Sequence, residues 1–257
     1  MRIITPFVLS LLLTAVLSPE LGAEDKKAEA ATSEAAAPEA SGPVASTATP
    51  KPYALVFDSA RNGKQLGETR VTLKPLDDER WEFAFDTRAT RGMAGFIGFK
   101  FREYSVFRWR DGRPETIDYG YAKKTGFRWK RRSLHIDAEN QTITGRDDDG
   151  EFSIDYQPRL IDRNLNLVAI SQDLRSGRAD FSYLLANKRT ISRRDFVLEG
   201  EETLATALGP LTTVRVRRQL TRPGRATTLW LAPTLDYQPV QVRQVEADGE
   251  TIELKLR

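Results

Sequence analysis

From residue 52 onward, large apolar residues alternate with polar or small residues along most of the chain. Trp81, Phe83 and Phe85 show the pattern clearly. A period of two is typical of a β-strand that has one buried and one solvated face. The same pattern predicts further strands at 99–109, 117–121, 127–129, 214–216, 229–231, 240–242 and 252–256.

Turn signals separate these runs, and one segment has a helical pattern instead. Pairs such as Asn62-Gly63 and Asp248-Gly249 have the spacing of consecutive antiparallel hairpins. Between 160 and 176 the apolar residues form a rough helical stripe, with Asp162 or Asn164 as the N-terminal cap and Gly177 as the stop. We therefore predict a mainly β fold, an antiparallel curved sheet forming a closed or half-open barrel, with one helix.

The first 51 residues have a different character from the rest. A basic start, an apolar run and small residues ahead of Glu24 predict a signal peptide over 1–23, with an uncleaved anchor as the alternative. Residues 24–51 are rich in Ala, Glu, Ser and Pro, which predicts a disordered linker before a single β-rich domain at 52–257. We expect an exported, periplasmic, soluble protein with no transmembrane segment.

Composition removes several classes of chemistry. The chain has no cysteine and one histidine, so it lacks a thiol nucleophile, a lipoprotein acylation site, disulfides and thiolate zinc sites. His135 lies in a strand-like run, where we interpret it as an ordinary sheet side chain rather than a catalytic group. The sequence predicts neither a cofactor nor a metal, and the modest net charge of +3 gives no reason to expect nucleic acid as a partner.

Carboxylates leave one catalytic alternative open. The acidic run at 146–151 has consecutive rather than alternating carboxylates, which favours a hairpin turn over a calcium loop. Asp155, Asp180 and Glu201 could pair for hydrolysis of an envelope glycan, a question of distance that sequence does not answer.

Two segments suggest a binding surface. Residues 91–99 place glycines among bulky apolar groups, which fits either a bent barrel corner or a lipid-facing lip. Residues 100–132 interleave cations with aromatic rings, which predicts rings on the core face and cations on a solvated, anion-attracting outer face.

The carboxyl-terminal part resembles a family of exported bacterial proteins catalogued as domain of unknown function 3108. The resemblance lies in a Gly209 that precedes a Val-rich strand, in Trp230-Leu231-Ala232-Pro233 and in Pro239-Val240, although Gln238 stands where leucine is common. It extends to the opening strands and the helical segment, and so spans essentially the whole domain. It implies a periplasmic β-rich fold and no assigned activity, hence no catalytic residues.

Our leading hypothesis from sequence is a non-catalytic binding or scaffolding module for an apolar or amphiphilic cell-envelope ligand. The expected partners are a lipid or envelope polymer, or an envelope protein for which the chain is a structural partner. The aromatic residues of one strand parity are the candidates for ligand contact: Phe96, Phe99, Phe101, Tyr119 and Trp129.

Overall fold

A computed structural model describes residues 49–92, 95, 98–220 and 224–257. The predicted signal peptide, most of the predicted linker and Phe96 lie outside these residues. The strands are β1 (Tyr53–Arg61), β2 (Lys64–Pro75), β3 (Arg80–Ala89), β4 (Lys100–Arg110), β5 (Arg113–Thr125), β6 (Arg128–Asp137), β7 (Thr142–Asp147), β8 (Gly150–Asp155), β9 (Leu160–Asp162), β10 (Phe181–Asn187), β11 (Thr190–Thr206), β12 (Gly209–Arg218), β13 (Ala226–Ala232), β14 (Gln238–Val245) and β15 (Thr251–Leu256), and the helices are α2 (Asn166–Arg175) and the 3-10 turn η1 (Pro233–Leu235).

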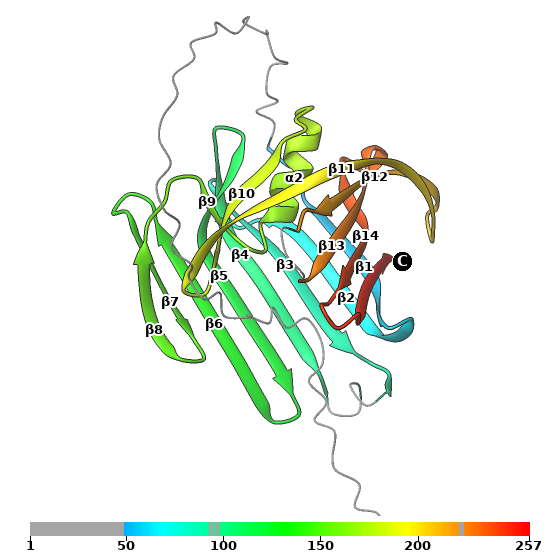
Figure 1. The fold of residues 1–257 in the computed structure, drawn as a ribbon, viewed down its shortest axis with the longest axis horizontal. Helices are drawn as coiled ribbons and strands as arrows, with labels where there is room; N and C mark the ends of the chain where they lie inside the picture. Colours follow the sequence, from blue (N-terminus) through cyan, green and yellow to red (C-terminus); the bar gives the residue numbers. More distant parts are fainter. Residues whose placement is uncertain (1–48, 93–94, 96–97, 221–223) are drawn as a thin grey trace, which may run out of the picture. The chain divides into compact units, whose positions relative to one another are not determined.

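All fifteen strands form one curved sheet, in the order β8-β7-β6-β5-β4-β3-β2-β1-β15-β14-β13-β12-β11-β10-β9 (Figure 1). Every pairing is antiparallel except that of β9 with β10. The outermost strands, β8 and β9, do not pair with each other, so hydrogen bonding leaves the barrel open along one line. These findings confirm the predicted mainly β fold with a curved, half-open sheet and one α-helix.

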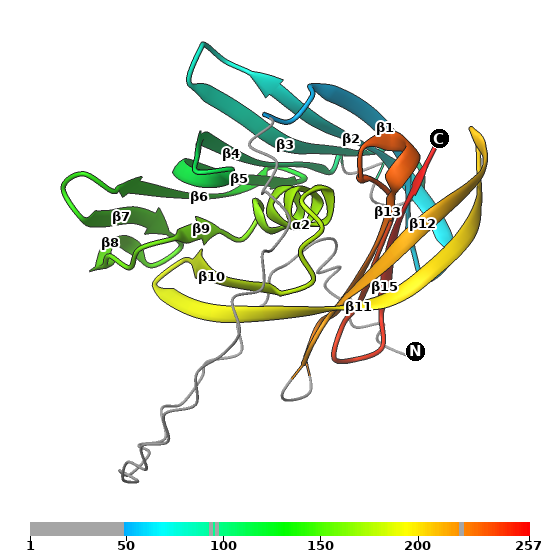
Figure 2. The ribbon, with the colours of Figure 1, turned by 90° about the horizontal axis from the view of Figure 1, so that it is seen from above.

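The helix α2 lies inside the curve of the sheet, between β4–β5 and β10–β12 (Figure 2). Its buried Ile170 and Val168 join a core that includes Phe57 and Phe83 from one half of the sheet and Val216 from the other. Helix and sheet therefore share one hydrophobic core. No helix among the described residues is long and apolar enough to cross a membrane.

The helix is shorter than predicted, because residues 160–162 form strand β9. The carboxylate of Asp162 nevertheless accepts backbone hydrogen bonds from Asn164 (2.8 Å) and Leu165 (3.3 Å), just ahead of the first helical turn. Gly177 ends the helix in the left-handed conformation, with φ at 68°. Gly177 is thus confirmed as the stop signal, whereas the predicted N-terminal cap is wrong: Leu165 occupies the N-cap position without a side-chain cap hydrogen bond, and Asp162 binds the segment just before the helix.

Side chains fasten the open line of the sheet, which we call the seam, between β5–β8 on one side and β9–β11 on the other. Arg189, in the β10–β11 turn, donates two hydrogen bonds of 3.0 Å to the buried carboxylate of Asp147 at the end of β7. This paired geometry holds the pKa of Asp147 below its usual value. The guanidinium of Arg189 also lies 5.0 Å from the ring centre of Phe152 on β8.

Candidate ligand-binding site

Three of the aromatic residues predicted to contact a ligand lie on the inner face of β4 and β5 or, in the case of Phe99, directly before β4. Phe99, Phe101 and Tyr119 are all buried, at 1%, 3% and 7% exposed. Trp129 is 47% exposed on the opposite, outer face, where Lys124 and Arg131 lie over its ring. The structure therefore brings Phe99, Phe101 and Tyr119 to one face and separates them from Trp129; their contact with a ligand stays a prediction.

A buried polar cluster beneath α2 attaches β9 to the inner face of the sheet. The carboxylate of Asp162, which is fully buried, accepts hydrogen bonds from the hydroxyls of Ser105 (2.8 Å) and Thr116 (3.0 Å), on β4 and β5. The backbone N–H of Asp162 donates to the same Thr116 hydroxyl at 2.8 Å. Burial raises the pKa of Asp162 to about 6, although these hydrogen bonds oppose the rise.

A second buried contact lies beside the first. Glu103, on β4, accepts hydrogen bonds from the Tyr119 hydroxyl (2.8 Å) and from Nε of Arg163 (2.6 Å). The Arg163 side chain is 16% exposed and that of Glu103 only 6%, so the pair is largely removed from water. With Asp162, it holds the segment that enters α2 against the middle of the sheet, and this placement leaves a space beside β9.

That space is a cavity of about 280 Å³. Its apolar wall includes the buried side chains of Pro114, Ile136, Leu160 and Ile161, and Ala169 contributes from α2. The β4–β5 hairpin, the end of β6, the segment before β9 and the start of β10 surround it; its other lining residues are Arg110, Asp111, Arg113, Glu115, Ala138, Tyr156, Arg159, Gln172, Asp173 and Tyr183.

The charged groups of this cavity are not all neutralised by neighbours. Asp173, 4% exposed, accepts hydrogen bonds from the Tyr183 hydroxyl (2.7 Å) and from Arg178 (3.0 Å). Glu115 likewise pairs with Arg108 at 2.6 Å and with the lining residue Arg110 at 3.6 Å. Two exposed lining arginines, Arg113 and Arg159, form no ion pair with any described residue. Among the acidic lining residues, Glu115 and Asp173 are paired and Asp111 remains. The two arginines therefore give the cavity a positively charged rim above its apolar wall.

The model of a family described as "Protein of unknown function (DUF3108)" matches residues 53–257. The chain belongs to the DUF3108 family. Comparison with curated proteins gives no match.

Two examples of solved structures similar to this DUF3108 protein come from different bacteria. A beta-barrel-like protein of domain of unknown function DUF1849 from Brucella abortus shares 10% identity with a TM-score of 0.52, over 80% of this chain and 95% of that chain. The hypothetical lipoprotein YmcC from Escherichia coli K12 shares 14% identity over 80% and 84% of the two chains, with a TM-score of 0.30. The first likeness supports the barrel-like fold; the second is too weak to support an argument.

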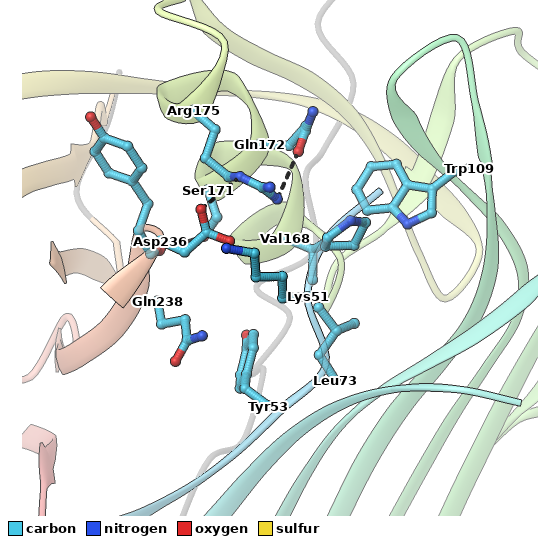
Figure 3. Close-up of a pocket in the computed structure, with 12 residues that line it drawn as sticks. Lys51, Tyr53, Leu73, Trp109, Val168, Ser171, Gln172, Arg175, Asp236 and Gln238 are labelled. Carbon is cyan, nitrogen blue, oxygen red and sulfur yellow. Dashed lines mark hydrogen bonds and ion pairs between the residues drawn. The ribbon is translucent and has the colours of Figure 1, made fainter. Parts of the chain in front are cut away.

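A second hollow in the DUF3108 domain is too small for a ligand. It holds about 20 Å³, room for one water molecule, between α2, Trp109 and Tyr53. Figure 3 shows Arg175 beside Asp236 in this hollow, at an ion-pair distance of 3.1 Å. We therefore place the candidate site in the larger cavity.

The other candidates from sequence lie elsewhere in the DUF3108 domain. His135 is exposed and pairs with Asp118 at 2.7 Å, as expected of a sheet side chain. The acidic run forms the β7–β8 hairpin turn, as predicted, and no group of three metal-ligating side chains gathers within the described ranges. Asp155, Asp180 and Glu201 are exposed on β8, before β10 and on β11, a placement that gives the glycan-hydrolysis alternative no support.

Sequence reasoning did not find the residues that line the cavity. A signal was present in Leu160-Ile161-Asp162, where an acidic residue directly follows two apolar ones in a segment interpreted as helix. A buried carboxylate needs hydrogen-bond partners. Identifying Ser105 and Thr116 as the partners of Asp162 would have shown that this segment lies against β4 and β5.

Proposed function

We propose that this DUF3108 domain is a non-catalytic binding module for an amphiphilic, anionic molecule of the cell envelope. The observation that supports the proposal is the cavity of about 280 Å³ with an apolar wall and a cationic rim. Its volume is close to the lower end of small-molecule sites, about 300 Å³. The apolar part of the ligand lies against Ile136, Leu160 and Ile161, and its anionic group lies at Arg113 and Arg159.

The polarity of the cavity favours binding over catalysis. Its one buried carboxylate, Asp173, is engaged by Tyr183 and Arg178, so it is not available to a substrate. An apolar wall gives affinity through buried area, at about 25 cal/mol per Å². The arginines add orientation, because a guanidinium recognises carboxylate or phosphate groups in a fixed geometry.

We include export in this proposal. The predicted signal peptide at 1–23 would deliver the domain to the periplasm, and the predicted linker at 24–51 would give it reach from an attachment point. A ligand drawn from envelope lipids or polymers follows from that location.

The test is calorimetric titration of the mature protein with dodecanoate and, in parallel, with the uncharged dodecanol. Ala138→Phe should weaken binding of both by about tenfold or more, because the new ring occupies the half-buried edge of the cavity. The double variant Arg113→Gln/Arg159→Gln should weaken dodecanoate alone. Arg88→Gln is the matched control, because this exposed residue of β3 pairs with Lys100, at the opposite end of β4 from the cavity-lining Arg110. Equal dodecanoate affinity in all variants would refute this site.

Native mass spectrometry of protein isolated from its own source then identifies the natural occupant. A stoichiometric amphiphile supports the binding module. A protein that carries no small molecule and holds a partner chain instead favours the scaffolding alternative.

A further inference from the structure

The inner face of the sheet has a second cationic feature, away from the cavity. Strand register places Phe101, Lys123 and Lys130 side by side across β4, β5 and β6. Tyr121 and Arg132 form the next cross-strand pair on the same face. The interleaved sequence of this region predicted cations on the outer face. That prediction is wrong here, because Trp129 occupies the outer face and these cations point inward.

Lys123 lacks the partner that a buried cation needs. It is 8% exposed, and its ammonium lies 5.9 Å from the ring centre of Phe99, with no carboxylate at ion-pair distance within the described part of the chain. Burial, together with smaller contributions from the nearby charges of Lys130, Arg132 and Arg61, lowers its pKa to about 8. Aromatic rings attract a cation but do not neutralise it.

Arg132 presents a second unmet donor. Its guanidinium lies 5.0 Å from the ring centre of Tyr121 and one terminal nitrogen binds Asp148 at 2.7 Å, yet its Nε is buried and has no hydrogen-bond partner. Buried donors are normally satisfied, so an orphaned one points to an acceptor that the protein itself does not supply. The same carboxylate of Asp148 also serves Lys130 at 3.4 Å.

The local charge balance is strongly positive. Lys188, in the β10–β11 turn, lies across the seam from the cations of β5 and β6, and burial and the charge of Arg132 lower its pKa. Asp147 is engaged by Arg189, and Asp148 is shared between Lys130 and Arg132. Asp148 and Asp149 therefore stand against the four cations Lys123, Lys130, Arg132 and Lys188.

We propose that Lys123, Lys130 and Arg132 bind a phosphate-type oxyanion on the inner face of the sheet. A phosphate monoester carries about −1.5 to −2 charges near pH 7 and several strong acceptor oxygens, which suits one ammonium and one Nε donor together. The adjacent rings of Phe99, Phe101 and Tyr121 would contact an apolar part of the ligand that is attached to the phosphate. None of these three residues lines the cavity, so a test of phosphate binding is independent of the test of the proposed function.

Inorganic phosphate is the first probe, compared with sodium chloride at equal ionic strength in thermal unfolding of the mature protein. We expect phosphate to raise the Tm of the wild type. Lys123→Met should abolish the rise without loss of folding, because it replaces an unpaired buried cation with an apolar side chain of similar length. Lys124→Met removes the same charge from the neighbouring outer-face position, over Trp129, and should keep the rise.

A measurement on the wild type makes the test independent of any variant. NMR of lysine side chains labelled at Cε should show the pKa of Lys123 rising when phosphate is added and staying constant with chloride, since a bound anion favours the charged ammonium. No pKa response, or equal phosphate stabilisation of Lys123→Met and Lys124→Met, would overturn the proposal.

The source of the phosphate is resolved by comparing inorganic phosphate with monomeric dihexanoyl phosphatidic acid. At least about tenfold tighter binding of the lipid identifies a phospholipid headgroup, while equal binding identifies a water-soluble phosphate.

Discussion

The buried carboxylate of Asp162 makes a prediction about stability against pH. Its pKa of about 6 lies roughly 2 units above the ordinary value of 3.8, and each unit corresponds to 1.36 kcal/mol between protonation states. Because the folded-state pKa is raised, the protonated group contributes stability that is fully present below pH 3.8 and is lost as pH rises through about 6. Ionisation of Asp162 therefore costs the folded state about 3 kcal/mol by pH 7.

Asp162→Asn removes this titration and keeps one acceptor oxygen for Ser105 and the backbone. We expect the free energy of unfolding of the variant, relative to wild type, to rise by about 2.3 kcal/mol between pH 4 and pH 7, because part of the total of about 3 kcal/mol is already lost at pH 4. Other carboxyls, such as Asp147, have lowered pKa values and lose stability toward acid in both proteins, so they cancel in the difference. Urea unfolding at four pH values across this range gives the difference directly.

Asp162→Ala is the control for the hydrogen bonds themselves. It leaves two hydroxyls and two backbone N–H groups without their acceptor, so it should destabilise the protein at every pH, by about 1–3 kcal/mol per buried group left unpaired. A difference between Asp162→Asn and wild type that stays constant within about 0.5 kcal/mol from pH 4 to pH 7 would refute the reasoning.

Three further results follow from packing and closure. Arg189→Met should leave the buried Asp147 unpaired, weaken the seam by about 1–3 kcal/mol and speed amide hydrogen exchange in the β7–β8 hairpin, while exchange at β13 stays unchanged. Phe83→Ala, at a fully buried core position, should cost about 3–5 kcal/mol in urea unfolding, whereas Phe127→Ala, in the exposed β5–β6 turn, should leave the midpoint unchanged. Gly67→Ala should lower the Tm markedly, because a Cβ there would lie 2.1 Å from a backbone carbonyl oxygen of β3; an unchanged Tm would show that the two strands can separate locally.

The strands could be predicted because burial follows parity wherever a core covers the inner face. In β3, Trp81 and Phe83 are buried as the alternation requires. The rule fails in β5, where a bulge places Ile117 opposite no partner, so that Thr116 and Tyr119 both face inward. Apolar residues occur on both parities there, and sequence alone does not show which residue is extra.

The hairpin that joins the end of β5 to the start of β6 shows a second limit of prediction from sequence. Aromatic rings were assigned to the core face and cations to solvent. The β5–β6 hairpin extends past α2 (Figure 1), and there Trp129 lies on the outer face while Lys123, Lys130 and Arg132 lie on the inner face. Phe101 and Tyr121 still occupy the inner face beside these cations and are each 3% exposed, so rings and cations share one face here and the period-two pattern does not separate them.

The candidate site could not be predicted because its walls meet only through long-range side-chain contacts. Asp162 reaches Thr116 and Ser105, which lie 46 and 57 positions away in the chain. Hydrophobic periodicity locates each strand and says nothing of which polar side chain crosses the interior. The same limit applied to the pairing of carboxylates, which sequence left open and which the structure places on separate elements.

The manner of closure connects the two binding proposals. A barrel closed by backbone pairing of β8 with β9 would satisfy its edges with hydrogen bonds and bring the strands to about 4.8 Å from each other. Here Arg189 and Asp162 close the seam with side chains, which hold the edges apart. The larger separation leaves the cavity at one end of the seam, beside Ile136 and Tyr183, and the cationic cluster of the proposed phosphate site at the other, beside Lys123 and Lys188. Loosening the seam through Arg189 should therefore alter binding at both places, whereas a change confined to Arg113 or to Lys123 should alter only one.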